Sequence, residues 1–102
     1  MKKIINGNTY DSESAVLVCK IWEGNRGDFS HLDCALYQTP RSKRFFLAGY
    51  GGPMTIFSER FSDGSIGSAE KIIPLTEQDA LAYARKYASM EALQKFFEVE
   101  EA

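Results

Sequence analysis

The sequence predicts an α+β fold: an antiparallel sheet of about four or five strands, with one or two C-terminal helices packed on one face. Short β-branched and aromatic runs, separated by turns rich in glycine, asparagine and proline, continue to residue 74. The spacing of apolar residues then becomes helical. A chain of 102 residues suits one two-layer core, so residues 1–102 are predicted to form a single domain.

The first predicted elements form a hairpin and a long strand. Asn6-Gly7 lies between two short runs of strand formers, which predicts a tight hairpin. A capped turn at residues 11–14 precedes the β-branched run 15–22, which predicts a largely buried strand. Residues 25–31 are rich in turn formers and predict a loop that exposes Phe29 and His31.

The centre of the sheet is predicted to be a hairpin of residues 32–38 and 44–48 with a basic tip between them. Residues 49–54 follow, with three glycines in four residues around Tyr50 and then Pro53. Glycine relaxes the backbone and proline fixes one dihedral angle, so this segment predicts a bend that displays Tyr50.

The remaining elements are two strands and two helices. Residues 55–61 and 70–74 predict strands, the second a short edge strand stopped by Pro74. Helical spacing from 77 to 88, with Thr76 as the N-cap, predicts an amphipathic helix. Ser89 is placed to cap a second helix over residues 91–97, and the acidic residues beyond it are expected in solvent: Glu98, Glu100 and Glu101.

The net charge and the lengths of the apolar runs limit the classes of partner that the sequence predicts. Twelve basic and 14 acidic residues give a formal charge of −2, too weak a field to imply nucleic acid or an anionic membrane. The N-terminal segment lacks the long apolar core of a secretory signal, and no apolar run reaches spanning length. We therefore expect a cytoplasmic protein without a membrane partner.

No cofactor or metal site is predicted. The glycines at 49–52 lack the following lysine of a phosphate loop and the glycine spacing of a dinucleotide fingerprint. Cys19 and Cys34 are not at CxxC spacing, and one histidine cannot complete a zinc site with them without carboxylates. Both cysteines are expected to be buried reduced thiols.

The residues most suited to a binding surface are large aromatic or apolar side chains near predicted loops and strand ends, with a basic group beside them. Such residue types are enriched at protein interfaces. The candidate anchors are Trp22, Phe29, Tyr37, Tyr50 and Met54, and the candidate rim is Arg41, Lys43 and Arg44. Trp22 suits a place in the core equally well.

Several segments resemble landmarks of a family of small proteins carried by phages and mobile elements. They are the initial Lys2-Lys3-Ile4-Ile5-Asn6-Gly7, Tyr10-Asp11, the Gly51-Gly52-Pro53-Met54 loop and Ile72-Ile73-Pro74-Leu75-Thr76. The similarity spans nearly the whole chain and implies a mobile-element context. By analogy with anti-CRISPR proteins, it implies a non-enzymatic inhibitor that binds a host defence complex, such as a CRISPR effector complex, stoichiometrically.

Three other functions compete with this one. The basic tip at residues 41–44 favours a nucleic-acid-binding accessory protein. A small hydrolase would need Cys34 and His31 as a catalytic pair. The two residues are three positions apart, and in a strand this spacing places their side chains on opposite faces. Exposed aromatic residues also suit a homodimer.

Overall fold

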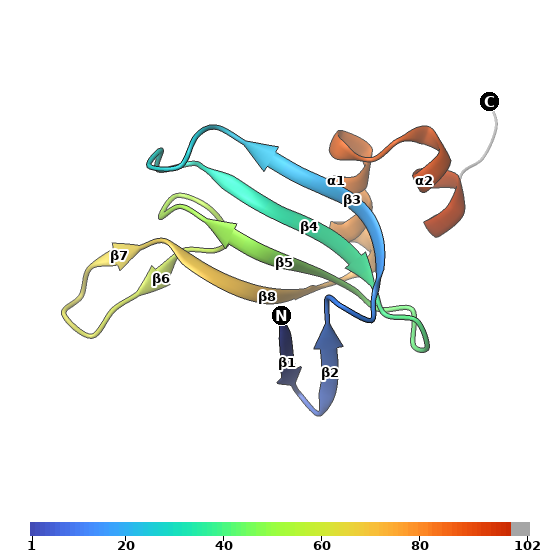
Figure 1. Cartoon of the computed structure of the whole chain (residues 1–102), viewed down its shortest axis with the longest axis horizontal. Coiled ribbons are helices and arrows are strands. Elements are labelled where there is room, and N and C mark those ends of the chain that lie inside the picture. Colours follow the sequence, from blue (N-terminus) through green and yellow to red (C-terminus); the bar gives the residue numbers. More distant parts are fainter. Residues whose placement is uncertain (99–102) are drawn as a thin grey trace.

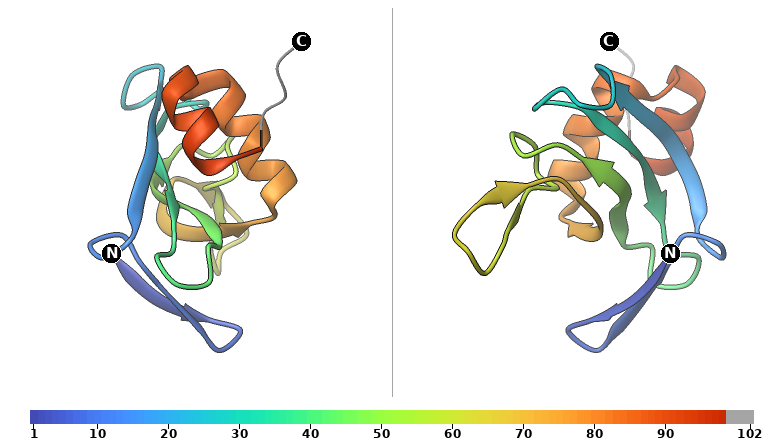
Figure 2. Two further views of the ribbon diagram at one scale, coloured as in Figure 1. Left: turned by 90° about the vertical axis from the view of Figure 1, so that its right-hand side faces the viewer. Right: turned by 60° about the vertical axis from the view of Figure 1, so that its left-hand side comes forward.

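The computed structural model describes residues 1–98 and confirms the α+β fold (Figure 1). Four antiparallel strands form the main sheet in the order β3-β4-β5-β8: β3 (Val16–Glu23), β4 (Leu32–Gln38), β5 (Phe45–Gly51) and β8 (Ala69–Leu75). Helices α1 (Glu77–Tyr87) and α2 (Met90–Phe96) cover one face of it (Figure 2). The predicted central hairpin, β4 with β5, does occupy the centre, and β8 is the predicted edge strand. Pro74 does not stop it as predicted, because β8 continues to Leu75 and pairs with β5 there.

The N-terminal hairpin is also confirmed, as a separate two-stranded sheet of β1 (Lys2–Ile5) and β2 (Asn8–Asp11). Asn6 and Gly7 have φ of 51° and 80°, and two positive values are what a type I′ turn requires. Tyr10 attaches the hairpin to the main sheet, because its buried ring meets Phe46 edge-on at 5.4 Å between centroids. Phe46 lies on the face opposite the helices.

The main core lies between the sheet and the helices. Its buried members are Val18, Cys19, Ile21, Cys34, Leu36, Phe45, Leu47, Phe57, Ala80, Ala84 and Phe97. Both cysteines are buried free thiols, as predicted. The prediction that β3 is largely buried is wrong, because β3 is an edge strand covered mainly on its helix side. Lys20 and Trp22 point the other way and are exposed. Leu17 is exposed beside α2.

The predicted bend at residues 49–54 is wrong in its first half, since β5 runs on through Gly51. Gly49 has a φ of +149°, and a Cβ there would lie 2.5 Å from the backbone oxygen of Asp33 on β4. The glycine therefore permits close strand pairing. Tyr50 is a half-buried strand residue and not the tip of a loop.

The predicted strand at residues 55–61 shrinks to β6 (Glu59–Arg60), which pairs with β7 (Ile66–Gly67). Residues 55–57 form a turn instead. The Thr55 hydroxyl donates to the Gly52 carbonyl at 2.7 Å and accepts from the Phe57 amide at 3.1 Å. Threonine side chains commonly form such local hydrogen bonds to the backbone, and these bonds compete with the backbone pairing of a strand. This turn directs Phe57 into the core, where it is fully buried.

Both helices begin as predicted. The Thr76 hydroxyl accepts from the Asp79 amide and the Ser89 hydroxyl from the Ala92 amide, each at 3.1 Å. After α2, Phe97 stacks on Phe45 with 4.9 Å between ring centroids, which closes the core. Glu98 is exposed, whereas the expectation for Glu100 and Glu101 lies outside the described residues. Neither helix is long and apolar enough to cross a membrane.

Candidate interaction surface

Two loops at one end of the main sheet pack against each other: residues 24–31 between β3 and β4, and residues 52–58 between β5 and β6 (Figure 1). The Gly52 amide donates to the His31 carbonyl and the Met54 amide to the Phe29 carbonyl, both at 2.8 Å. A Cβ on Gly52 would lie 2.5 Å from the Phe29 oxygen. Glycine at position 52 therefore lets the loops approach closely, and we call them the paired loops.

His31 anchors the paired loops from inside, and the prediction that it is exposed is wrong. Its exposed fraction is 3%. Nδ1 lies 3.2 Å from the Glu23 carbonyl oxygen, which only accepts, so Nδ1 carries the proton. Nε2 is buried and has no hydrogen-bond partner among residues 1–98. Phe29 remains exposed, so the loop buries one of its two ring-bearing residues and presents the other.

The Tyr50 ring is held by two residues of the first loop. His31 lies 5.8 Å from it between ring centroids, and the Arg26 guanidinium lies over it at 4.7 Å, in the range of a cation–π contact. Sequence reasoning expected Tyr50 to be displayed by a flexible glycine segment. The structure instead fixes the ring within the sheet and against the neighbouring loop.

Four large apolar side chains stand exposed around the paired loops. The exposed fractions are 68% for Trp22, 67% for Phe29, 71% for Met54 and 46% for Ile56. We call these four residues the loop surface. Trp22 is therefore not a core residue, and it lies in the same register row as Asp33 and Tyr50. Ile56 was missed because residues 55–57 look like part of a strand.

A cavity of about 300 Å³ separates Met54 and Ile56 from α1. Leu32 and Tyr83 provide apolar walls, and an adjoining cavity of about 320 Å³ continues along α1. No sequence pattern indicates this groove, because its walls come from segments about 30 residues apart. Apolar hollows beside exposed apolar side chains are the usual form of a binding surface.

A polar group closes the rim of this cavity. The Tyr87 hydroxyl donates to a Glu23 carboxylate oxygen at 2.7 Å, and Lys86 Nζ lies 3.5 Å from the same carboxylate. The hydrogen bond from Tyr87 and the charge of Lys86 lower the pKa of Glu23. Glu23 is thus ionised at neutral pH and ties the end of β3 to the end of α1.

The predicted anchors and the predicted basic rim do not form one surface. Arg41, Lys43 and Arg44 are exposed at the β4–β5 turn, at the other end of a seven-residue strand, about 20 Å away. Tyr37 also lies toward that end, where it stacks on Phe46 with 5.3 Å between centroids. The structure brings together four predicted residues, Trp22, Phe29, Tyr50 and Met54, at the loop end.

The Cys34 and His31 pair lacks the arrangement of a nucleophile and its base. Cys34 faces the helix-side core, whereas His31 contacts Tyr50 on the opposite side of the sheet. Burial raises the pKa of the Cys34 thiol to about 12, so the reactive thiolate is scarce at neutral pH. Among residues 1–98, moreover, no group of three histidine, cysteine or carboxylate side chains is placed to hold a metal ion.

Comparison with family models, with curated proteins and with solved structures finds no match to this chain.

Proposed function

We propose that this chain is a non-enzymatic interaction module that binds a partner protein through the loop surface. One observation carries the proposal: Phe29, Met54 and Ile56 are exposed on loops held by backbone hydrogen bonds, and Trp22 is exposed at the adjoining end of β3. Exposed apolar groups that gather in one place mark interaction sites, whereas scattered ones are ordinary. The hydrogen bonds between the paired loops also reduce the entropy lost when a partner binds.

Covering a large apolar side chain contributes about 1.5–3 kcal/mol, so the four residues together contribute about 6–12 kcal/mol. Association costs about 4–15 kcal/mol, so a tight complex also needs contacts from the rim of the surface. Trp22 is the strongest candidate anchor, because tryptophan dominates measured interface energies. The Arg26 and Glu23 side chains lie at the margin of the apolar residues and are suited to a polar rim.

The class of partner follows from the sequence resemblance to phage and mobile-element proteins. We propose that the partner belongs to a host defence machinery, with a CRISPR effector complex as the first candidate, and that binding inhibits it stoichiometrically. The protein is expected to act in the cytoplasm, where such complexes operate. The inhibitor should saturate its target at a fixed ratio and show no turnover.

The test is affinity capture of the tagged chain from a lysate of its own host, with and without nuclease. The variant combines Trp22→Ala with Met54→Ala, and the matched control is Phe61→Ala, which removes an apolar side chain that is 47% exposed outside the paired loops. We expect wild type and Phe61→Ala to retain one nuclease-resistant partner in a fixed ratio, and the double variant to bind it at least tenfold more weakly. Equal retention by all three would disprove the role of the loop surface. Recovery of the chain alone would indicate self-association.

The basic tip supports a second candidate, a nucleic-acid-binding accessory protein. Arg41, Lys43 and Arg44 are exposed, and none of the ion pairs among residues 1–98 involves them. Lys2 of the N-terminal hairpin lines a shallow cavity together with Arg41, and Asp11 borders the same cavity. This function predicts nucleic-acid affinity that falls steeply with salt and is lost when the three tip residues become glutamine. A gel shift at low salt that detects neither duplex nor single strand would eliminate it.

A further inference from the structure

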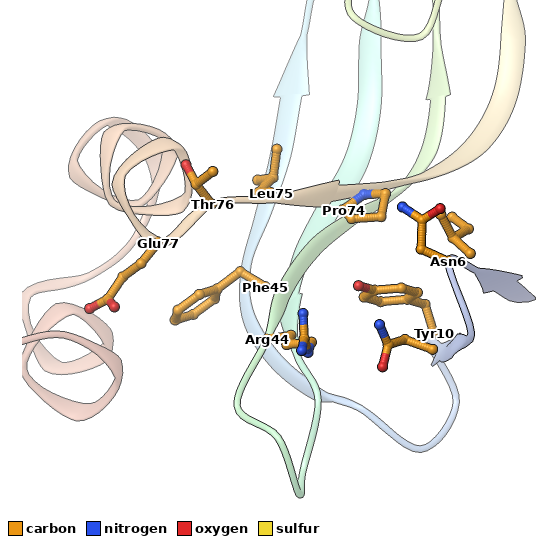
Figure 3. A pocket seen from close by; sticks show the side chains of 10 residues that line it. Asn6, Tyr10, Arg44, Phe45, Pro74, Leu75, Thr76 and Glu77 are labelled. Atoms are coloured by element: carbon orange, nitrogen blue, oxygen red, sulfur yellow. The ribbon is translucent and has the colours of Figure 1, made fainter.

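A cavity of about 420 Å³ lies at the end of the main sheet remote from the loop surface, between the N-terminal hairpin and the start of α1 (Figure 3). We call it the hairpin cavity. It lies where two sequence landmarks meet, the turn containing Asn6 and the segment Pro74-Leu75-Thr76, which the loop surface does not use. Its volume is within the range of small-ligand sites, about 300–1,000 Å³.

Tyr10 contributes an unpaired hydrogen-bond donor to this cavity. The residue is 96% buried, since its exposed fraction is 4%, and its ring is fixed against Phe46. Figure 3 shows the hydroxyl pointing away from the hairpin, toward the side of the cavity where Arg44 and Phe45 lie. No hydrogen bond of this hydroxyl is formed with any group of residues 1–98. The hydroxyl oxygen is not among the buried polar atoms that lack a partner in residues 1–98, so it reaches the open cavity and is free to donate to a bound group.

Arg44 contributes an unpaired charge. Its backbone amide is fixed by the Thr39 hydroxyl at 2.9 Å, and its side chain lines the cavity between Phe45 and Tyr10 (Figure 3). Within residues 1–98 the ion pairs are Lys71 with Glu59 and Lys86 with Glu23, so the guanidinium has no carboxylate within 4.0 Å. A guanidinium presents parallel donors that match the two oxygens of a carboxylate.

The rest of the lining determines the kind of anion. Glu77 borders the same cavity, so Arg44 and Glu77 leave the lining without net formal charge, which disfavours a doubly charged phosphate. Phe45, Pro74 and Leu75 supply an apolar wall beside the donors. We propose that the hairpin cavity binds a carboxylate attached to an apolar group, with Arg44 and the Tyr10 hydroxyl as the donors. This goes beyond the proposed function and does not depend on it.

The test is an NMR titration of the ¹⁵N-labelled chain with N-acetyl-L-phenylalanine, and with its carboxamide as the uncharged control. For a ligand of this size we expect a Kd on the order of 1 mM and saturable shifts confined to the hairpin, residues 44–45 and residues 74–77. The carboxamide should bind at least tenfold more weakly. Absence of saturation, or equal binding of acid and amide, would overturn the proposal.

Two variants and one control connect the binding to the named donors. Tyr10→Phe keeps the ring against Phe46 and removes only the hydroxyl, so the Kd should rise about fivefold. Arg44→Gln should raise it at least tenfold, whereas Lys43→Gln makes the same charge change at a residue outside the cavity and should leave it unchanged. Thermal unfolding verifies that each variant is folded. Equal affinity of Arg44→Gln and Lys43→Gln would refute a role for Arg44.

The source of the carboxylate is resolved by two further probes, 3-phenylpropanoate and a tetrapeptide ending in phenylalanine with a free C-terminus. Tighter binding of the tetrapeptide assigns the cavity to the C-terminus of a protein. Tighter binding of 3-phenylpropanoate assigns it to a small organic acid. Both outcomes support the carboxylate site, and failure of both probes contradicts it without affecting the loop surface.

Discussion

Replacing Gly52 with alanine tests whether the paired loops are held together as the structure indicates. A Cβ at this position would lie 2.5 Å from the Phe29 carbonyl oxygen and 2.8 Å from that of Asp28. Ordinary van der Waals contact begins at 3.4 Å, so the loops must separate by about 0.9 Å. The neighbouring atoms are backbone, which cannot rotate away as a flexible side chain would.

The expected cost follows from the hydrogen bonds between the loops. The bonds from Gly52 to His31 and from Met54 to Phe29 measure 2.8 Å, and a separation of 0.9 Å takes them to about 3.7 Å, beyond hydrogen-bond range. At about 1 kcal/mol each, their loss lowers the free energy of unfolding by about 2 kcal/mol. For a domain of this size that corresponds to a fall in Tm of about 10 °C.

The assay combines urea unfolding followed by far-UV circular dichroism with amide hydrogen exchange. Fluorescence is a poor probe of unfolding here, because the sole tryptophan is already 68% exposed in the folded chain. The amides of residues 52 and 54 should lose protection, while those of β4 and β5 keep theirs. Ser30→Ala, at an exposed position in the same pair of loops, is the control and should change stability by less than about 0.5 kcal/mol. If Gly52→Ala matches this control in both measurements, the described packing of the loops is wrong.

Three further predictions concern the core, the Glu23 carboxylate and the thiols. Phe57→Ala should lower the free energy of unfolding by about 3–5 kcal/mol in urea titrations, because the ring is fully buried; a loss below 1 kcal/mol would contradict its place in the core. Since the pKa of Glu23 is lowered in the folded state, its stabilising effect is complete above the ordinary value of 4.5 and is lost as the pH falls through the lowered pKa. Tyr87→Phe removes the largest cause of this shift, so Tm should fall less between about pH 5 and pH 3 than in wild type; parallel curves would disprove the link. Cys19 and Cys34 should react with a thiol reagent at pH 8 only after unfolding, because burial raises both pKa values, and rapid labelling of the native chain would contradict this.

The elements that the sequence predicted correctly are those specified by local chemistry. Asn6-Gly7 determines its turn because both residues tolerate positive φ, and Thr76 and Ser89 begin their helices because their hydroxyls accept the nearby amides. The central hairpin and the edge strand β8 are likewise recognisable from short segments. Each of these signals depends on residues close in sequence, which is why no tertiary knowledge was needed.

The errors all concern contacts between segments distant in sequence. Gly49 and Gly51 look like a bend when they are considered alone, but the approach of β4 makes them part of a strand. Residues 55–57 have strand propensity, yet the Thr55 hydroxyl forms a local turn, and the burial of Phe57 against distant core residues favours that turn over a strand. His31 looks like an exposed loop residue, and it is buried because Tyr50, nineteen positions later, packs against it.

The candidate site, like the fold, was predictable from the sequence only in part. The sequence determined which residue types were available for binding, and it named Trp22, Phe29, Tyr50 and Met54 from their chemistry and their places near turns. Only the tertiary structure decided that these four lie at one end of the sheet while Arg41, Lys43 and Arg44 lie at the other end. The physical reason is that residue chemistry is local, whereas the proximity of side chains depends on strand order and on which loops share an end of the sheet.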